Sequence, residues 1–313
     1  MKRLVCLFGI IILFSCTNDT AYKSIPSEKI LSHYKQFSRY TDPGKFAYMF
    51  KDLPESLPKL CSLIKRQLIH PVDLGELRKS LPEERHFEDP YYPTVQAMLR
   101  GLLHYDQRGL TPERRPVDRL IVACYNHALL LTSILRQRGI PVRIRAGFAR
   151  YFEKKAGVRF GHAICEVWDK REKRWMLVDP DRQFVDFSWN RFESSASAWE
   201  RLRAGKADPE RYVASLSKGD HAILHILLLD LACVLGEERP YWQEPPILRH
   251  EISDVKNIDS ERLQILDQVA ELLSDPDANF SQLSLLYDKH KFLQKTELDF
   301  DTWFNERQVP GKK

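Results

Sequence analysis

Between residues 120 and 190 the spacing of apolar residues changes from helical to alternating, and this change restricts the possible folds. Residues 128–135 (ALLLTSIL) are apolar almost all round, which is typical of a buried helix. Gly139 and Pro141 then predict its end, because glycine caps a helix and proline cannot continue one. We therefore expect one buried helix to lead directly into a sheet.

Three strands are predicted after this helix. In residues 142–148 apolar side chains alternate with Arg143, Arg145 and Gly147, the pattern of a half-buried strand. Two further strands, 161–168 (GHAICEVW) and 175–179 (WMLVD), flank a charged turn and read as a hairpin. The fold class indicated is α+β, with a buried helix packed on an antiparallel sheet.

Helical patterns surround this central region. Residues 26–110 are predicted to be a helical lead-in, residues 111–190 the α+β core, and residues 191–313 a helical C-terminal region. Within the last region, residues 222–235 are strongly apolar but too short to span a membrane, so we expect a core helix. Asp259 is placed to cap a later amphipathic helix.

The first residues have the order of a processing signal. Lys2 and Arg3 precede an apolar run at 4–14, which is too short for a bilayer that needs about 20 helical residues. The following sequence resembles a bacterial lipobox and predicts a signal peptide over 1–15, lipidation of Cys16 and a tether over 16–25. Phe14 stands where a small residue is usual, so an ordinary secretory signal is the alternative.

This signal predicts an envelope protein that touches the membrane only through its lipid. Its removal lowers the formal net charge from +5 to +3, because Lys2 and Arg3 are lost. A nearly neutral chain without a basic run gives no support for nucleic-acid binding. The cysteines are too far apart in sequence for a zinc knuckle, so neither a metal nor a cofactor is predicted.

Three residues can form a nucleophilic site. Cys124 opens the buried helix, where unpaired backbone N–H groups and the helix dipole lower a thiol pKa. His162 begins the second strand, and a hairpin symmetric about the bond between Lys170 and Arg171 places it opposite Asp179. A carboxylate there orients the imidazole of a nucleophile and base pair. Asp181 and Asp186 are the alternatives if the register differs.

The same segments resemble a known family. The stretch 124–148 (CYNHALLLTSILRQRGIPVRIRAGF), then 161–169 (GHAICEVWD) and 174–180 (RWMLVDP), is similar to the transglutaminase-like superfamily. The resemblance implies a papain-like core with Cys124 as nucleophile, His162 as base and Asp179 as orienting carboxylate.

One feature of the animal transglutaminases is missing. All tryptophans of this chain follow Cys124, so the upstream tryptophan that assists the oxyanion there has no counterpart. An oxyanion-hole donor is worth about 3 kcal/mol, so another donor is expected. Tyr105 is the first candidate by position, ahead of His104 and Gln107.

Other residues of types that can take part in catalysis or binding are expected to have structural roles. Packing roles are predicted for the remaining histidine of the buried helix, two cysteines and two residues of the second strand: His127, Cys61, Cys233, Glu166 and Trp168.

The first functional hypothesis is a cysteine acyl transferase or hydrolase that attacks amide or peptide carbonyls. Its substrates would be proteins or peptides, cell-wall peptides included. The second hypothesis is a lipid-tethered binding or assembly module that keeps the fold without turnover. A third is oxidation of Cys124 with Cys165, although strand parity directs Cys165 away from His162.

Overall fold

The computed structural model describes residues 22, 24–153, 157–215, 217–249 and 255–294. The predicted signal peptide, the lipidation site Cys16 and most of the tether lie outside these described residues. Within the described ranges, no helix combines the length and the apolar character needed to cross a bilayer.

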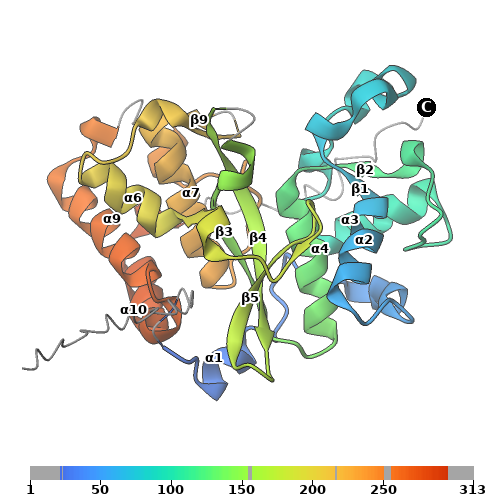
Figure 1. Cartoon of the computed structure of the whole chain (residues 1–313), viewed down its shortest axis with the longest axis horizontal. Helices are drawn as coiled ribbons and strands as arrows, with labels where there is room; N and C mark the ends of the chain where they lie inside the picture. Colours follow the sequence, from blue (N-terminus) through green and yellow to red (C-terminus); the bar gives the residue numbers. More distant parts are fainter. Residues whose placement is uncertain (1–21, 23, 154–156, 216, 250–254, 295–313) are drawn as a thin grey trace, which may run out of the picture.

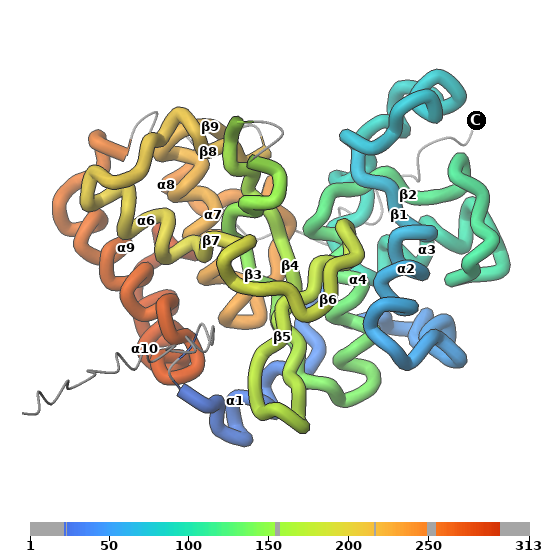
Figure 2. The backbone as a smooth tube through the Cα atoms, in the orientation of Figure 1, coloured from blue at the N-terminus to red at the C-terminus, as the bar shows by residue number. Residues whose placement is uncertain are grey.

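A largely antiparallel sheet runs through the middle of the molecule (Figures 1 and 2). In the described part of the chain it has seven strands, with β6-β5-β4-β3-β7 side by side and β8 paired both to β4 and to β9. A separate parallel pair joins β1 to β2. The strands are β1 (Leu68–Ile69), β2 (Leu120–Ile121), β3 (Val142–Ala149), β4 (Arg159–Asp169), β5 (Arg174–Asp179), β6 (Phe184–Val185), β7 (Phe192–Ser194), β8 (Tyr212–Ala214) and β9 (Ser217–Lys218).

Helices cover the sheet on both sides. The α-helices are α1 (Glu28–His33), α2 (Leu57–Gln67), α3 (Val95–Tyr105), α4 (Cys124–Gln137), α6 (Ser195–Arg203), α7 (Gly219–Val234), α8 (Pro246–Arg249), α9 (Ser260–Leu273) and α10 (Pro276–Lys289). Short 3₁₀ helices connect them: η1 (Gly44–Phe50), η2 (Pro71–Asp73), η3 (Gly75–Ser80), η4 (Glu83–Arg85), η5 (Asp89–Tyr91), η6 (Pro116–Asp118), η7 (Arg150–Phe152), η8 (Trp189–Arg191), η9 (Pro209–Arg211), η10 (Val255–Asn257) and η11 (Lys291–Leu293).

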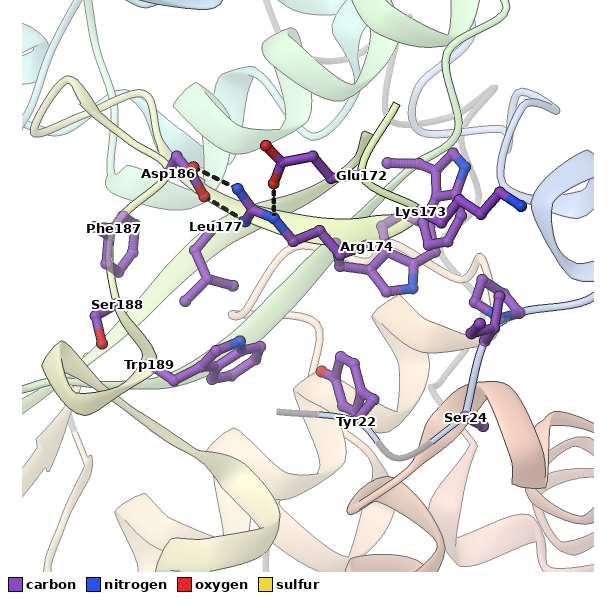
Figure 3. A pocket seen from close by; sticks show the side chains of 14 residues that line it. Tyr22, Ser24, Glu172, Lys173, Arg174, Leu177, Asp186, Phe187, Ser188 and Trp189 are labelled. Atoms are coloured by element: carbon purple, nitrogen blue, oxygen red, sulfur yellow. Dashed lines mark hydrogen bonds and ion pairs between the residues drawn. The ribbon is translucent and has the colours of Figure 1, made fainter. Parts of the chain in front are cut away.

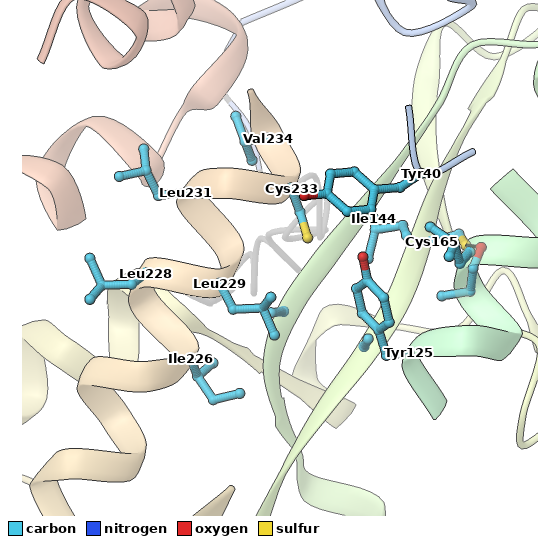
Figure 4. Packing of buried hydrophobic residues seen from close by; sticks show 14 of the residues in the cluster. Tyr40, Tyr125, Ile144, Cys165, Ile226, Leu228, Leu229, Leu231, Cys233 and Val234 are labelled. Atoms are coloured by element: carbon cyan, nitrogen blue, oxygen red, sulfur yellow. Dashed lines mark hydrogen bonds between the residues drawn. The ribbon is translucent and has the colours of Figure 1, made fainter. Parts of the chain in front are cut away.

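The core has three layers. Helix α4, with α2 and α3 behind it, packs on one side of β3 and β4, while α7, α6 and α9 lie on the other side (Figure 1). Figure 4 shows Leu229 and Cys233 of α7 meeting Ile144 of β3 and Tyr125 of α4 within one buried cluster. The mixed α+β architecture agrees with the predicted fold class.

Several local predictions are confirmed. The buried helix is α4, and both Gly139, with φ at +67°, and Pro141 lie beyond its end. The apolar stretch 222–235 lies almost entirely in α7, whose residues from Ala222 to Val234 are all buried. Asp259 caps α9 by accepting the backbone N–H of Arg262.

The extensions are not purely helical. Strands β7, β8 and β9 come from the C-terminal region, and β1 comes from the lead-in. These strands are only two or three residues long, so they carry too little periodicity to stand out in a sequence.

The prediction of a half-buried β3 is wrong, because every residue of this strand is buried. Arg145 donates from Nε and Nη2 to Asp230 of α7, at 2.8 and 2.9 Å, and Arg143 pairs with Glu166 and with Asp277 of α10. In the sequence, arginines that alternate with apolar residues indicate a strand with one face in solvent. In the structure, acidic residues of the C-terminal helices cover the face of β3 that carries these arginines.

The hairpin register also differs from the prediction. Cys165 pairs with Val178 and Trp168 with Trp175, two residues away from the predicted alignment. Asp169 Oδ1 accepts the backbone N–H groups of Arg171 and Glu172, and the turn is centred on the bond between these two residues, one residue later than predicted. Because the shift is even, each side chain stays on the face where it was expected.

Candidate active site

Cys124 is the first residue of α4. The preceding residue, Ala123, is the N-cap; it donates its N–H to Asp89 Oδ1 at 2.8 Å and accepts from His127 Nδ1 at 3.0 Å. In the first turn of a helix, backbone N–H groups such as that of Cys124 have no acceptor within the helix. The Cys124 thiol therefore lies in a field that favours a thiolate or another anion.

His162 and Asp179 meet beside this thiol. His162 Nε2 lies 2.8 Å from Asp179 Oδ2, and the ring also makes a hydrogen bond with Cys124. Since Nε2 faces Asp179, Nδ1 is the nitrogen left for the thiol. Asp179 is fully buried, and its Oδ1 accepts the backbone N–H of Arg182 at 3.0 Å.

Gly161 permits the close packing that holds His162. A Cβ at this position would lie 2.7 Å from the Ala214 Cβ and 2.9 Å from the Ile226 Cδ1. Only a residue without a side chain fits where β4 passes between β8 and α7.

The charges of the three groups support one another. Burial opposes ionisation of Cys124, but the charge and hydrogen bond of His162, together with the hydrogen bond of His70, outweigh it and lower its pKa to about 6. Burial likewise opposes a charged His162, yet Cys124 and Asp179 raise its pKa well above the ordinary value. The pKa of Asp179 is lowered: His162 and hydrogen bonds overcome the effect of burial. This arrangement favours a thiolate–imidazolium pair.

Aromatic side chains enclose the His162–Asp179 pair. Tyr151 donates its hydroxyl to Asp179 Oδ2 at 2.5 Å, and its ring packs edge-on against His162 with centroids 5.9 Å apart. Phe152 packs edge-on against the same imidazole at 5.5 Å. Excluding water from this pair strengthens its electrostatic interaction. Tyr151 could not be predicted as part of the site, because a tyrosine after a strand carries no distinctive signal in the sequence.

A second histidine, also missed, contacts the nucleophile. His70 follows β1 and makes a side-chain hydrogen bond with Cys124. The parallel pairing of β1 with β2 brings it there, with the Val122 N–H donating to the Ile69 carbonyl at 2.9 Å. In the sequence, His70-Pro71 reads only as a helix break, since a pairing across about fifty residues leaves no local pattern.

The predicted oxyanion candidates are directed elsewhere. The Tyr105 hydroxyl donates to Glu88 Oε1 at 3.3 Å, and Arg85 stacks over its ring at 4.0 Å. His104 packs against the same ring, and Gln107 donates to the Leu103 carbonyl at 2.6 Å.

The alternative carboxylates have other partners. Asp181 is buried, with Oδ1 2.5 Å from Lys65 Nζ and 3.6 Å from His127 Nε2. Burial lowers the pKa of His127 to about 4, despite the opposing charge of Asp181, which is consistent with a packing histidine. Asp186 is paired with Arg174 at the surface.

The other cysteines do not engage Cys124. Among the described residues Cys61, Cys124, Cys165 and Cys233 are all free thiols. Cys165 donates to the Ala128 carbonyl at 3.4 Å and is buried, so the oxidised pair of the third hypothesis is not present. Burial raises the pKa of Cys61 to about 12, as expected for an unreactive thiol.

The described residues contain no group of histidine, cysteine and carboxylate side chains arranged to hold a metal ion.

A surface cavity of about 510 Å³ lies away from Cys124, between the N-terminal segment, β5 and residues 186–189 after β6 (Figure 3). Its walls include Tyr22, Trp189, Arg174 and Asp186, and none of Cys124, His162 and Asp179 lines it.

Comparison with known proteins places these residues in a family. The searches of curated proteins and of solved structures gave no match. A model of the transglutaminase-like superfamily matches residues 91–180, a range that begins before the predicted core and contains Cys124, His162 and Asp179. This central part of the chain, from the end of η5 through β5, is therefore a transglutaminase-like domain.

Proposed function

We propose that this protein is a cysteine acyl transferase or hydrolase acting on amide or peptide carbonyls. The observation that carries the proposal is the His162 ring, hydrogen-bonded to the buried Asp179 on one side and to Cys124 at a helix N-terminus on the other. A nucleophile, a base and an orienting carboxylate in this order are the parts that covalent acyl transfer requires.

Each residue has a defined step. The Cys124 thiolate attacks the carbonyl carbon and forms the C–S bond, while the carbonyl electron pair moves to oxygen. The carbonyl then re-forms, the C–N bond breaks, and the amine leaves with a proton from the His162 imidazolium. Neutral His162 next takes a proton from water or from a second amine, which attacks the thioester and frees Cys124. Asp179 holds the ring in place and stabilises its charged form throughout.

The choice of substrate follows from this chemistry. Proteins and peptides, including cell-wall peptides, present the carboxamide or peptide carbonyl that such a site attacks. Water as acceptor gives a hydrolase and an amine gives a transferase. Incubation with a glutamine peptide and a primary-amine probe, followed by mass spectrometry, distinguishes deamidation or cleavage from amine incorporation.

A test of the nucleophile needs no natural substrate. Iodoacetamide and p-nitrophenyl acetate are each added to the folded protein at pH 7, and the modified residue is identified by peptide mass spectrometry. We expect both reagents to modify Cys124 rapidly, His162→Ala to slow both reactions, and Cys124→Ala to abolish them. Slow modification of Cys124, unaffected by His162→Ala, would instead favour the non-catalytic binding module.

We also propose that the protein is anchored to the cell envelope through Cys16. The support is the order of a basic pair, a short apolar run and Leu13-Phe14-Ser15-Cys16. Labelling of cells with a palmitate analogue is expected to mark the wild-type protein and not Cys16→Ala. Equal labelling of both would reject Cys16 as the lipid site, and labelling of neither would leave an ordinary secretory signal as the explanation.

A further inference from the structure

We propose that His70 is a further catalytic residue, whose Nε2–H and the Cys124 backbone N–H together bind the oxyanion formed when Cys124 attacks a carbonyl. This inference rests on the proposed function and adds to it the missing donor. It replaces Tyr105, whose hydroxyl donates to Glu88.

The fold places His70 next to the nucleophile from a separate part of the chain. Leu68 and Ile69 of β1 pair with Leu120 and Ile121 of β2, and α4 starts three residues after β2 ends. His70 therefore approaches Cys124 from β1, whereas His162 approaches from β4. The imidazole that exchanges protons and the imidazole proposed to bind the oxyanion come from separate elements.

The hydrogen bonds of His70 determine which nitrogen carries its proton. His70 Nδ1 accepts the backbone N–H of Val72 at 3.3 Å, as the side-chain cap of η2. A ring that accepts at Nδ1 carries its hydrogen on Nε2. His70 is therefore a donor toward Cys124 and does not compete with His162 for the role of base.

A donor that contacts the sulfur can also reach the oxyanion. In the tetrahedral intermediate the oxygen is bonded to the carbon that the sulfur has attacked, so it lies close to Sγ. The backbone N–H of Cys124 points out of the first helical turn into the same region. Two N–H donors of this kind, one from the nucleophile itself, make an oxyanion hole.

Two substitutions separate the two hydrogen bonds of His70. In His70→Asn, the side-chain oxygen occupies the position of Nδ1 and can still cap Val72, but the group that reaches Cys124 is absent. In His70→Gln, the amide nitrogen extends to the position of Nε2 and keeps a donor. Tyr105→Phe serves as the matched control, because it removes the hydroxyl that contacts Glu88.

The readout compares two reactions of the same sulfur. In acylation by p-nitrophenyl acetate, Sγ bonds to the carbonyl carbon, an oxyanion forms and collapses, and p-nitrophenolate leaves. In alkylation by iodoacetamide, Sγ displaces iodide from a methylene carbon, and no oxyanion forms. Both rate constants are taken at their high-pH plateaus, where Cys124 is fully ionised, so that a changed thiol pKa does not affect the ratio.

We expect His70→Asn to lower the acylation rate constant by about 10² to 10³ and the alkylation rate constant by much less. His70→Gln should recover most of the acylation rate, and Tyr105→Phe should change neither rate. Equal losses in both reactions for His70→Asn, or no loss in either, would overturn the oxyanion role. A normal alkylation plateau also reports that the variant is folded.

The same measurements keep the two proposals apart. If wild-type Cys124 is not acylated at all, the proposed function fails. If wild-type Cys124 is acylated and His70→Asn leaves the ratio of acylation to alkylation unchanged, only the role of His70 fails.

Discussion

His162 Nε2 and Asp179 Oδ2 lie 2.8 Å apart although the two residues are not directly opposite each other in the β4–β5 ladder. Cys165 pairs with Val178, so the alignment places Ile164 across from Asp179. His162 and Ile164 share a face because side chains alternate along a strand. Asp179 therefore reaches His162 diagonally from the end of β5, and the backbone N–H of Arg182 fixes its other oxygen.

The first prediction concerns this diagonal contact. Asp179→Asn removes the negative charge that stabilises the His162 imidazolium, so we expect acylation of Cys124 to fall by about 10². The measurement is the rate of p-nitrophenolate release in single-turnover kinetics. The control is Asp186→Asn, which removes only a surface pair with Arg174 and should leave the rate unchanged. A slower rate in Asp186→Asn together with an unchanged rate in Asp179→Asn would make Asp186 the orienting carboxylate.

The second prediction concerns Tyr151, which acts through Asp179. Tyr151→Phe removes the hydroxyl that donates to Asp179 Oδ2 and leaves the ring against His162. We expect about a tenfold slower acylation, the equivalent of roughly 1.4 kcal/mol, with little change in stability. The loss of rate comes from orientation, because Asp179 is then held by one hydrogen bond fewer. The pH profile of the rate should move slightly downward, because a carboxylate that accepts one hydrogen bond fewer is a stronger base and stabilises the imidazolium more. Tyr48→Phe, at an exposed position, should change neither rate nor profile.

The third prediction is the pH dependence of Cys124 alkylation. The thiolate is the reactive form, so the rate is expected to rise with pH and to be half-maximal near pH 6, the lowered pKa of Cys124. His162→Ala removes the cation, and burial then raises the thiol pKa, which shifts the midpoint upward. A wild-type midpoint at the value of an ordinary thiol would contradict the ion pair.

The fourth prediction tests the buried arginines of β3. Arg145→Met leaves the buried Asp230 without its bidentate partner, and removing one member of such a pair costs about 3 to 5 kcal/mol. Arg203→Met breaks a surface pair with Asp267 and should cost about 1 kcal/mol or less. Urea unfolding measures both. Similar values for the two variants would show that the buried pair contributes no more than the surface pair.

The fifth prediction tests the packing at Gly161. Gly161→Ala adds a methyl group in contact with Ala214 and Ile226, and overpacking of this kind costs about 1 to 3 kcal/mol. The double variant with Ala214→Gly removes the closest clash and should recover part of the loss in the free energy of unfolding. Additive losses in the double variant would place the strain elsewhere.

The local sequence pattern was sufficient to predict the central helix and the hairpin. The apolar run after Cys124 predicts α4, and Gly139 and Pro141 predict its end, because these signals depend on neighbours in the chain. Strand parity placed His162 and Asp179 on one face of the hairpin, and an even error in register left that result intact.

Contacts between distant segments decided the rest. His70 reaches Cys124 because β1 pairs with β2, and Arg143 and Arg145 are buried because acidic residues from α7 and α10 meet them. Tertiary packing offsets the chain entropy that is lost when distant segments come into contact. This packing produces no periodic pattern of apolar residues in either segment. The sequence by itself thus determined the helix, the hairpin and the face that His162 and Asp179 share, whereas the tertiary structure alone decided which further side chains surround Cys124.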